Sequence, residues 1–326
     1  MKKKWSKGIA LLAAACMCVL SGPVMPGTAN AADAPEWRLE YWDPADDMFE
    51  YQIDYGETDS SHEEVTVDDM TFAVYEKHAV LTAGKSGTVV TIPSEVNGVP
   101  VTEIQYWSFS NSDYLMKLNL PDTLIAIGND AFHNCTHLLE VNFPDSLRVI
   151  EYEAFENCSN LKSVKFGSGL KVIDKAAFSG CSALSSAEFS DSIEYILDSA
   201  FQNTGFEEIT LPDGLQYLGA NMFRDCTSLK SAYSGSGVPG LLDNCFKGCT
   251  ALESVHLEPN VKTIGYGCFR DCTSLTQVEI AGELESIGER AFQGCTSLSA
   301  ITVPGNAVEV GNYAFDSCPL TTLDMN

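Results

Sequence analysis

The sequence predicts an α/β repeat solenoid, because apolar residues and cysteines recur at fixed spacings through the last two thirds of the chain. A phenylalanine returns every 23 residues, an aliphatic residue precedes it by five positions, and a cysteine usually follows it by three. Such a period is typical of solenoids, whose units stack because none can bury its apolar face alone. Only the step from Phe201 to Phe223 is shorter, by one residue, in the series Phe109, Phe132, Phe155, Phe178, Phe201, Phe223, Phe246, Phe269, Phe292 and Phe315.

Residues 1–31 have the composition of a signal peptide. Four lysines precede an apolar run from Gly8 to Leu20, and Ala29-Asn30-Ala31 offers small residues for cleavage before Ala32. The run is too short to span a bilayer. We therefore expect a secreted or cell-surface protein with no membrane insertion after cleavage. An alternative makes Cys16 a lipid-bearing residue.

The net charge of the mature chain indicates which classes of partner it can bind. Without the leader, 15 basic residues face 45 acidic ones, which gives a formal charge of −30. Such a surface repels nucleic acid and anionic membranes and favours basic partners.

The segment 32–69 is acidic but also aromatic, with fourteen Asp or Glu residues and a single basic residue, Arg38. The alternation over 49–56 predicts a strand, and we expect a loosely held lead-in before it. A calcium site there is an alternative, but no glycine supplies the sharp turn of a calcium loop near the acids Asp43, Asp46, Asp47 and Glu50. Residues 70–108, with short strand patterns and Pro93, are expected to form a β-rich N-terminal cap and a degenerate first repeat.

Residues 109–326 are expected to form the solenoid, in units that read L-x-x-V-x-L-P-x-x-L-x-x-I-G-x-x-A-F-x-x-C. The L-x-x-V-x-L part has inward residues at period two, as a strand of a parallel sheet requires. The A-F-x-x-C-x-x-L part spaces its apolar residues by three, which favours a helical or 3₁₀ turn. The prediction is an arc of about ten units. A parallel β-sheet forms its concave face, and short helical or 3₁₀ turns lie opposite.

The unit from Leu147 to Phe166 resembles the BspA-like, or Treponema-type, leucine-rich repeat in its period, its A-F-x-x-C core and its strand ending. The resemblance covers about residues 72–326. It implies a leucine-rich repeat arc and an adhesive function, since related proteins are thought to bind host matrix proteins, other cells or mucosal surfaces.

The cysteines of the mature chain first suggest disulfides, as expected for an exported protein. Runs of three and five cannot all pair with neighbours, so the pattern favours a ladder of buried thiols that pack as small apolar residues. The ladder consists of Cys135, Cys158, Cys181, Cys226, Cys249, Cys272, Cys295 and Cys318. Cys245 and Cys268 form a separate neighbouring pair, and a disulfide between them stays open.

Neither a metal site nor a catalytic site is predicted. His133, Cys135 and His137 are close in sequence, but Cys135 belongs to the ladder, and other units place unrelated residues at the histidine positions. No nucleophile, metalloprotease, P-loop or dinucleotide motif occurs in its required context. We expect a protein that is not an enzyme and needs no cofactor, with an exported hydrolase as a remote alternative.

Function is expected on the concave sheet, where outward side chains of successive strands form rows. We name one such set the outward row and expect it to bind a protein or a surface glycan or polymer: Asn142, Lys165, Glu188, Tyr233, His256 and Glu279. Tyr233 and His256 lie beside an irregular segment, Ser234 to Gly240, which is either a flaw in the stack or a notch for a ligand. The chain is expected to be a monomer. An alternative is a structural module that presents segment 32–69 to a partner.

Overall fold

The computed structural model describes residues 36–43, 48–55, 61–304 and 309–324. The predicted leader lies outside the described residues, as do Asp46, Asp47 and the side chains of Asp43 and Glu50 that were considered for calcium. Within the described ranges, no helix has the length and apolar character needed to cross a membrane.

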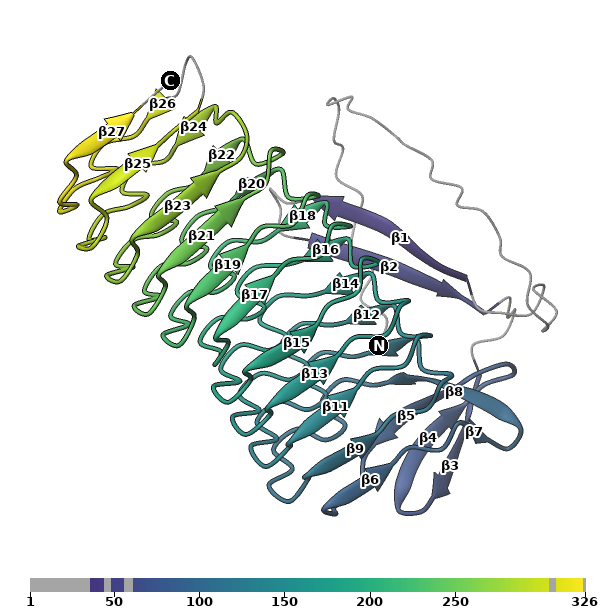
Figure 1. Cartoon of the computed structure of the whole chain (residues 1–326). Coiled ribbons are helices and arrows are strands. Elements are labelled where there is room, and N and C mark those ends of the chain that lie inside the picture. The colour runs from purple at the N-terminus through teal and green to yellow at the C-terminus, as the bar shows by residue number, and fades with distance from the viewer. Residues whose placement is uncertain (1–35, 44–47, 56–60, 305–308, 325–326) are drawn as a thin grey trace.

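The chain winds into a stack of coils, and the coils contribute short strands to two walls (Figure 1). The short-strand wall holds β10(Ala126–Ile127), β12(Val149–Ile150), β14(Val172–Ile173), β16(Tyr195–Ile196), β18(Tyr217–Leu218), β20(Gly240–Leu241), β22(Thr263–Ile264), β24(Ser286–Ile287) and β26(Glu309–Val310). The long-strand wall holds β9(Lys117–Asn119), β11(Glu140–Asn142), β13(Ser163–Lys165), β15(Ser186–Glu188), β17(Glu208–Thr210), β19(Ser231–Tyr233), β21(Ser254–Leu257), β23(Gln277–Ile280), β25(Ala300–Thr302) and β27(Thr322–Asp324).

Both walls are parallel and keep the repeat register. Val141 pairs with Val164 in the long-strand wall, and Val149 pairs with Val172 in the short-strand wall. The predicted parallel strands are therefore confirmed, and a second parallel wall accompanies them.

A cap of mixed strands closes the N-terminal end of the stack. β3(Glu63–Val67), β4(Met70–Val74) and β5(Ala79–Ala83) are antiparallel, and β5 then pairs in parallel with β8(Val99–Ile104), which β7(Glu95–Val96) flanks. β8 begins the short-strand wall, and β6(Val89–Thr91) begins the long-strand wall beside β9. Met70, Phe72 and Leu81 are fully buried and cover the end of the core.

The recurring phenylalanines, which we name the anchors, form one stacked column through the core. Ring centroids of neighbouring anchors are 4.9 Å apart at Phe132 and Phe155 and 6.1 Å apart at Phe201 and Phe223, the widest step, which coincides with the short unit. The aliphatic residues five positions before them, such as Ile127, are also buried.

The segment around each phenylalanine is a run of turns, and no helix occurs in the described parts of the chain, so the predicted helical or 3₁₀ turns are wrong. The cause is a left-handed backbone two residues before and two residues after the phenylalanine. Around Phe155, Glu153 has φ 52° and Asn157 has φ 59°. A right-handed helix cannot continue through such residues.

The residue two positions after each anchor is suited to this backbone in almost every coil. Asparagine, aspartate and glycine tolerate a positive φ better than other residues. The column consists of Asn111, Asn134, Asn157, Gly180, Asn203, Asp225, Gly248, Asp271, Gly294 and Ser317, all with positive φ.

The left-handed residues let the turns bond to the neighbouring coil. The N–H of Phe155 donates to the carbonyl of Ala177, and the N–H of Asn157 donates to that of Ser179, each over 2.8 Å. The N–H of Cys158 instead donates within its own coil, to the carbonyl of Phe155. The turns are thus cross-linked from coil to coil, as strands are.

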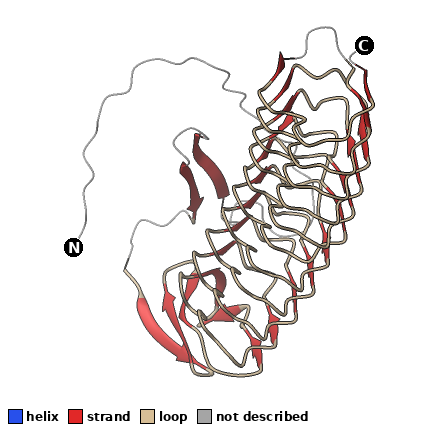
Figure 2. Ribbon diagram, turned by 90° about the vertical axis from the view of Figure 1, so that its left-hand side faces the viewer, coloured by secondary structure: helices blue, strands red, loops and turns tan. Residues whose placement is uncertain are grey.

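The N-terminal segment forms an antiparallel hairpin of β1(Glu36–Asp43) and β2(Met48–Asp54), which lies on the outer side of the short-strand wall (Figure 2). Trp37, Tyr51 and Ile53 pack on three small or branched residues of that wall, Ala126, Val149 and Val172. Trp37 of β1 is therefore packed against the wall, where a loosely held lead-in was expected.

Two tyrosines of this segment bond to the wall beneath it. The hydroxyl of Tyr51 donates to Glu151, and that of Tyr55 donates to Glu103 over 2.5 Å. Burial is the largest cause that raises the pKa of Glu151, and the hydrogen bond from Tyr51 acts against it.

Candidate functional site

The long-strand wall carries the predicted outward row, and the structure divides that row into two groups. Lys165 pairs with both Asn142 and Glu188 across β11, β13 and β15, and its Nζ lies 3.1 Å from Glu188 Oε2. Both charged side chains are largely exposed, so their ion pair adds little stability.

The second group joins Tyr233, His256 and Glu279 across β19, β21 and β23. The Tyr233 and His256 rings lie 5.9 Å apart with a 34° tilt. His256 Nδ1 is 3.0 Å from Glu279 Oε2, and its Nε2 is 3.3 Å from Glu258 Oε1. The imidazole is thus held between two carboxylates, and Tyr233 keeps 43% of its surface exposed.

Both walls are interrupted near the units that the sequence marks as irregular. β15 and β17 belong to separate sheets, and so do β18 and β20. Unit length alone does not interrupt a sheet, because β25 and β27 lie 22 residues apart, as β15 and β17 do, and yet remain paired. Ser234, the polar residue of the irregular segment, is buried, and its hydroxyl accepts the N–H of Glu258 over 2.9 Å.

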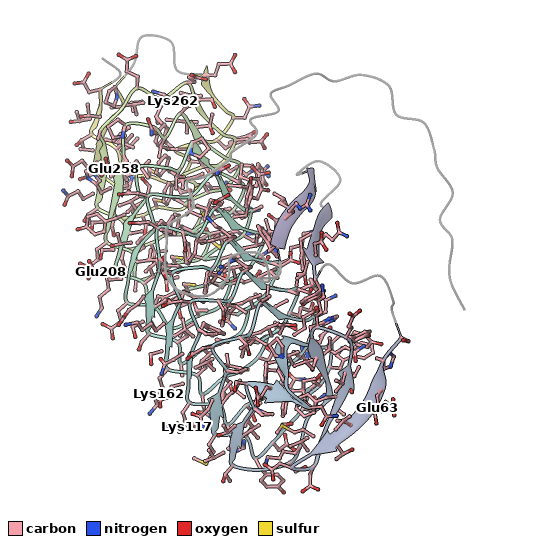
Figure 3. The ribbon with its side chains drawn as sticks, turned by 90° about the vertical axis from the view of Figure 1, so that its right-hand side faces the viewer. Glu63, Lys117, Lys162, Glu208, Glu258 and Lys262 are labelled. Atoms are coloured by element: carbon pink, nitrogen blue, oxygen red, sulfur yellow. The ribbon has the colours of Figure 1, made fainter. Side chains whose placement is uncertain are left out.

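A hollow of about 590 Å³ opens where β15 and β17 separate. We name it the Tyr233 hollow. Its walls come from β15, β17, β19 and the irregular segment, and it is lined by Ala187, Phe189, Asp191, Glu208, Thr210, Leu211, Pro212, Asp213, Tyr233, Gly235 and Glu258. Its carboxylates and its half-exposed tyrosine form an acidic surface with one aromatic face. Glu208 and Glu258 lie along the edge of the molecule away from the hairpin (Figure 3).

Two of the aspartates in this hollow are also fixed to the backbone. Asp213 Oδ1 accepts the N–H of Ser236 over 2.7 Å, and Asp191 Oδ1 accepts the N–H of Asp213 over 3.2 Å. The bond from Ser236 is the largest cause that lowers the pKa of Asp213. The Asp213 carboxylate therefore stays charged to a lower pH than an ordinary aspartate does.

Sequence reasoning placed Tyr233 at the irregular segment but missed most of the other lining residues. Asp191 and Asp213 follow their strands three residues after the outward row, at a position that Asp145 also occupies. This aspartate, which recurs at one position of the repeat, is the sequence signal that marks them. Of the predicted outward row only Tyr233 lines the hollow, and the others do not: Asn142, Lys165, Glu188, His256 and Glu279.

A second cavity, of about 300 Å³, lies beside the hairpin and is lined by Trp37, Pro100, Thr102, Thr123, Ile125, Ser146 and Arg148. No sequence pattern indicates this cavity, because Trp37 reaches the wall only through the docking of β1. Arg148 Nη1 donates to the carbonyls of Asp145, Ser146 and Leu147, so the guanidinium is largely used by its own loop.

The cysteines of the described chain form no disulfide. Cys245 and Cys268, left open as a pair, are both free and buried, as are the ladder cysteines, with Cys318 half-buried. Each ladder thiol donates to the anchor carbonyl of the coil before it, as Cys158 does to Phe132 over 3.3 Å and Cys181 to Phe155 over 3.2 Å. Burial is the largest cause that raises the pKa of Cys158 and Cys249.

The sequence cluster of His133, Cys135 and His137 is not brought to one point. The Cys135 thiol is fully buried and donates to the carbonyl of Phe109, whereas His137 is exposed. His133 instead faces acidic side chains of its own coil and the next.

The chain matches the family model described as the BspA type leucine rich repeat region, over residues 102–230 and 228–326. Among solved structures, it is similar to a leucine-rich repeat protein from Bacteroides ovatus at 24% identity, with a TM-score of 0.56, covering 80% of this chain and 88% of that one. It is also similar to the pneumococcal vaccine antigen PcpA at 20% identity and a TM-score of 0.52, covering 81% and 82%. A Treponema pallidum leucine-rich repeat protein is 28% identical over 67% of this chain and 90% of that one, with a TM-score of 0.48. No curated protein matches the chain.

Proposed function

Since the chain belongs to the BspA-type leucine-rich repeat family, we propose that it is an exported recognition protein that binds a basic segment of another protein or a cationic surface polymer. The Tyr233 hollow is the observation that carries the proposal. Leader-like residues 1–31 support export to the cell surface or the medium. Adhesion to a host or to another cell is the expected biological use.

Charge favours a basic ligand at the hollow. Asp191, Glu208, Asp213 and Glu258 line it together with Tyr233, whose exposed ring offers a face for a lysine or arginine head group. A cation over an aromatic face contributes about 0.5–1 kcal/mol at exposed sites. The overall excess of acidic residues would speed the approach of such a ligand at low salt.

Fluorescence anisotropy with a labelled lysine-rich peptide tests this assignment. We expect Tyr233→Ala and Glu208→Gln each to weaken binding about two- to fivefold, and the affinity to fall as salt rises. The matched controls are Tyr114→Ala, an exposed tyrosine elsewhere on the chain, and Glu64→Gln in the cap. Equal losses in the controls, or equal binding of a peptide with glutamine in place of lysine, would refute the hollow as the site.

A binding array of matrix proteins and glycans addresses the natural partner. The mature protein, starting at Ala32, is the probe, and the Tyr233→Ala variant is run beside it. A partner that binds at the Tyr233 hollow should bind the mature protein and should not bind the Tyr233→Ala variant. Uniform absence of binding at micromolar protein would argue against recognition as the function.

Presentation of the N-terminal segment is the alternative function. Trp37 and Tyr51 pack toward the short-strand wall, so a partner would have to use the outer face of the hairpin. Deleting residues 32–56 separates the two functions, because binding at the Tyr233 hollow should survive the deletion.

A further inference from the structure

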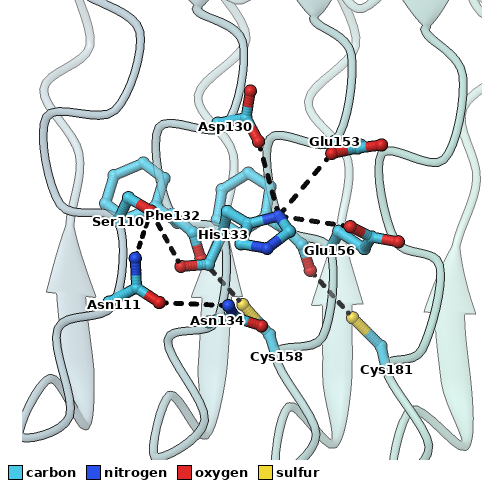
Figure 4. A network of polar contacts seen from close by, with 11 residues as sticks. Ser110, Asn111, Asp130, Phe132, His133, Asn134, Glu153, Glu156, Cys158 and Cys181 are labelled. Carbon is cyan, nitrogen blue, oxygen red and sulfur yellow. Dashed lines mark hydrogen bonds and ion pairs between the residues drawn. The ribbon is translucent and has the colours of Figure 1, made fainter.

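Four side chains from two neighbouring coils meet on the ridge of turns, far in sequence from the Tyr233 hollow. His133 Nδ1 lies 3.4 Å from Asp130 Oδ1, 3.8 Å from Glu153 Oε2 and 3.2 Å from Glu156 Oε2 (Figure 4). We name these residues the His133 cluster. Each of the four side chains is about four fifths buried, with 19–22% of its surface exposed.

We propose that the His133 cluster binds a divalent first-row transition-metal ion, with Zn²⁺ as the best fit. The four groups provide one imidazole nitrogen and three carboxylates, a donor set that suits such ions. Ca²⁺, which takes six to eight oxygen ligands, is a poorer match to a set that contains a nitrogen.

The repeat explains how the cluster assembles. Asp130 and His133 stand two residues before and one residue after their anchor phenylalanine, and Glu153 and Glu156 hold the same positions one coil later. The following coil has Ala176 and Ser179 there, so the ligand set is confined to these two coils. Asp130 and Glu153 both have a positive φ, of 54° and 52°. Glu153 is the less suited of the two to such a backbone, because aspartate tolerates a positive φ better than glutamate does.

The spacing of two donor atoms about His133 Nδ1 is close to that around a tetrahedral ion. Zn²⁺ bonds of about 2.0–2.1 Å imply ligand atoms about 3.3–3.4 Å apart at the corners of a tetrahedron. The separations from His133 Nδ1 to Glu156 and Asp130 lie within 0.2 Å of that value, at 3.2 and 3.4 Å. One ligand atom each from Asp130, His133 and Glu153 also falls within 4.8 Å of the others.

An independent observation concerns the imidazole itself. His133 Nδ1 is shielded from solvent and makes no hydrogen bond within the described residues. A buried polar nitrogen without a hydrogen bond is costly, and a metal bond would remove that cost. Three carboxylates are also crowded around this one imidazole. A divalent cation would offset their repulsion.

Isothermal titration of the chelator-treated mature protein with ZnCl₂ tests the site. We expect one tight site above the weak background of an acidic surface. His133→Gln and Glu156→Gln should each weaken that site at least tenfold, since losing even a residue that only orients a ligand costs about 10–100-fold. His137→Gln and Glu140→Gln are the matched controls, with the same residue types outside the cluster, and should leave it unchanged.

Co²⁺ provides a readout that needs no variant. Bound to the unmodified protein by one nitrogen and three oxygens in a tetrahedron, it should give intense visible absorption bands that Zn²⁺ then displaces. The proposal is overturned if Zn²⁺ binds only as weakly as Ca²⁺, if Co²⁺ gives no such bands, or if tight binding persists in folded His133→Gln protein.

Discussion

At the scale of single residues, Phe155 shows what the recurring anchor does. Its ring stacks between Phe132 and Phe178 at centroid separations of 4.9 and 5.3 Å, and the edge of Phe143 closes a third side. The side chain is fully buried. Each anchor thus packs against the coils before and after it and stabilises three coils at once.

Replacing Phe155 by alanine should therefore destabilise the middle of the stack. A buried phenylalanine-to-alanine change costs about 3–5 kcal/mol. Phe315→Ala is the matched control, because that ring is only half-buried and stacks on one neighbour, Phe292. Chemical denaturation should show a large shift for the first variant and a small one for the second. An unchanged midpoint for Phe155→Ala would contradict the anchor assignment.

The thiol ladder predicts a loss of stability at alkaline pH. Burial raises the pKa of Cys226 to about 11, whereas a thiol in an unfolded chain titrates near 8.5. The folded state therefore favours the protonated thiol. That stabilisation is complete below about pH 8.5 and is lost as the pH rises toward 11.

Melting temperatures of the protein and of Cys226→Ala, measured from pH 8 to pH 11, check this expectation. The stability difference between them should narrow as the pH rises, because only the parent loses the protonated Cys226 thiol. A stability difference that stays constant with pH would show that the Cys226 thiol has the same pKa in the folded and the unfolded chain.

At the scale of elements, the hairpin matters because it covers three coils of the short-strand wall. The residue six positions before the anchor is Ala126, Val149 and Val172 beneath it, but Thr263, Ser286 and Glu309 in later coils. At this position of the wall, the alanine and the two valines lie beneath the hairpin, which shields them from water. The wall and the hairpin are therefore matched to each other.

Tyr51→Phe should loosen the hairpin. The change removes the donor to Glu151 and leaves a mostly buried carboxylate less satisfied, a cost of about 1–3 kcal/mol. Hydrogen exchange of β1 and β2 should become faster, while exchange in β11 and β13 stays unchanged. Tyr106→Phe, at an exposed tyrosine, is the control. Unaltered protection of the hairpin would mean that its docking does not depend on this hydrogen bond.

The sequence predicted the repeat because a strict period constrains every coil alike. It mispredicted the turns because a three-residue apolar spacing is shared by helices and by these turns. The distinguishing signal was the column of Asn, Asp and Gly at Asn134, Asn157 and Gly180 and its repeats. The docking of Trp37 and Tyr51 and the convergence of Glu153 on His133 depend on contacts between distant segments, which periodicity does not encode.

At the scale of the molecule, the two sides of the solenoid are used differently. The hairpin occupies the outer side of the short-strand wall, whereas the Tyr233 hollow and the outward row lie on the long-strand wall. A ligand of the hollow would not need to displace the hairpin.

A chain lacking residues 32–56 should keep its solenoid and its affinity for the lysine-rich peptide, but it should self-associate. Removing the hairpin exposes Ala126, Val149 and Val172 to water, and exposed apolar patches drive association. Light scattering and binding of a hydrophobic dye should both increase, while anisotropy with the peptide stays unchanged. A truncated chain that neither associates nor binds the dye would mean that the covered stripe is too small to matter.

The docking of the hairpin also bears on how such an array can evolve by gain or loss of repeats. Tyr55 and Tyr51 bond to Glu103 and Glu151, which lie two coils apart. Deleting or duplicating a coil between them would separate these partners from their tyrosines. The hairpin thereby ties the number of coils between β8 and β12 to its own length.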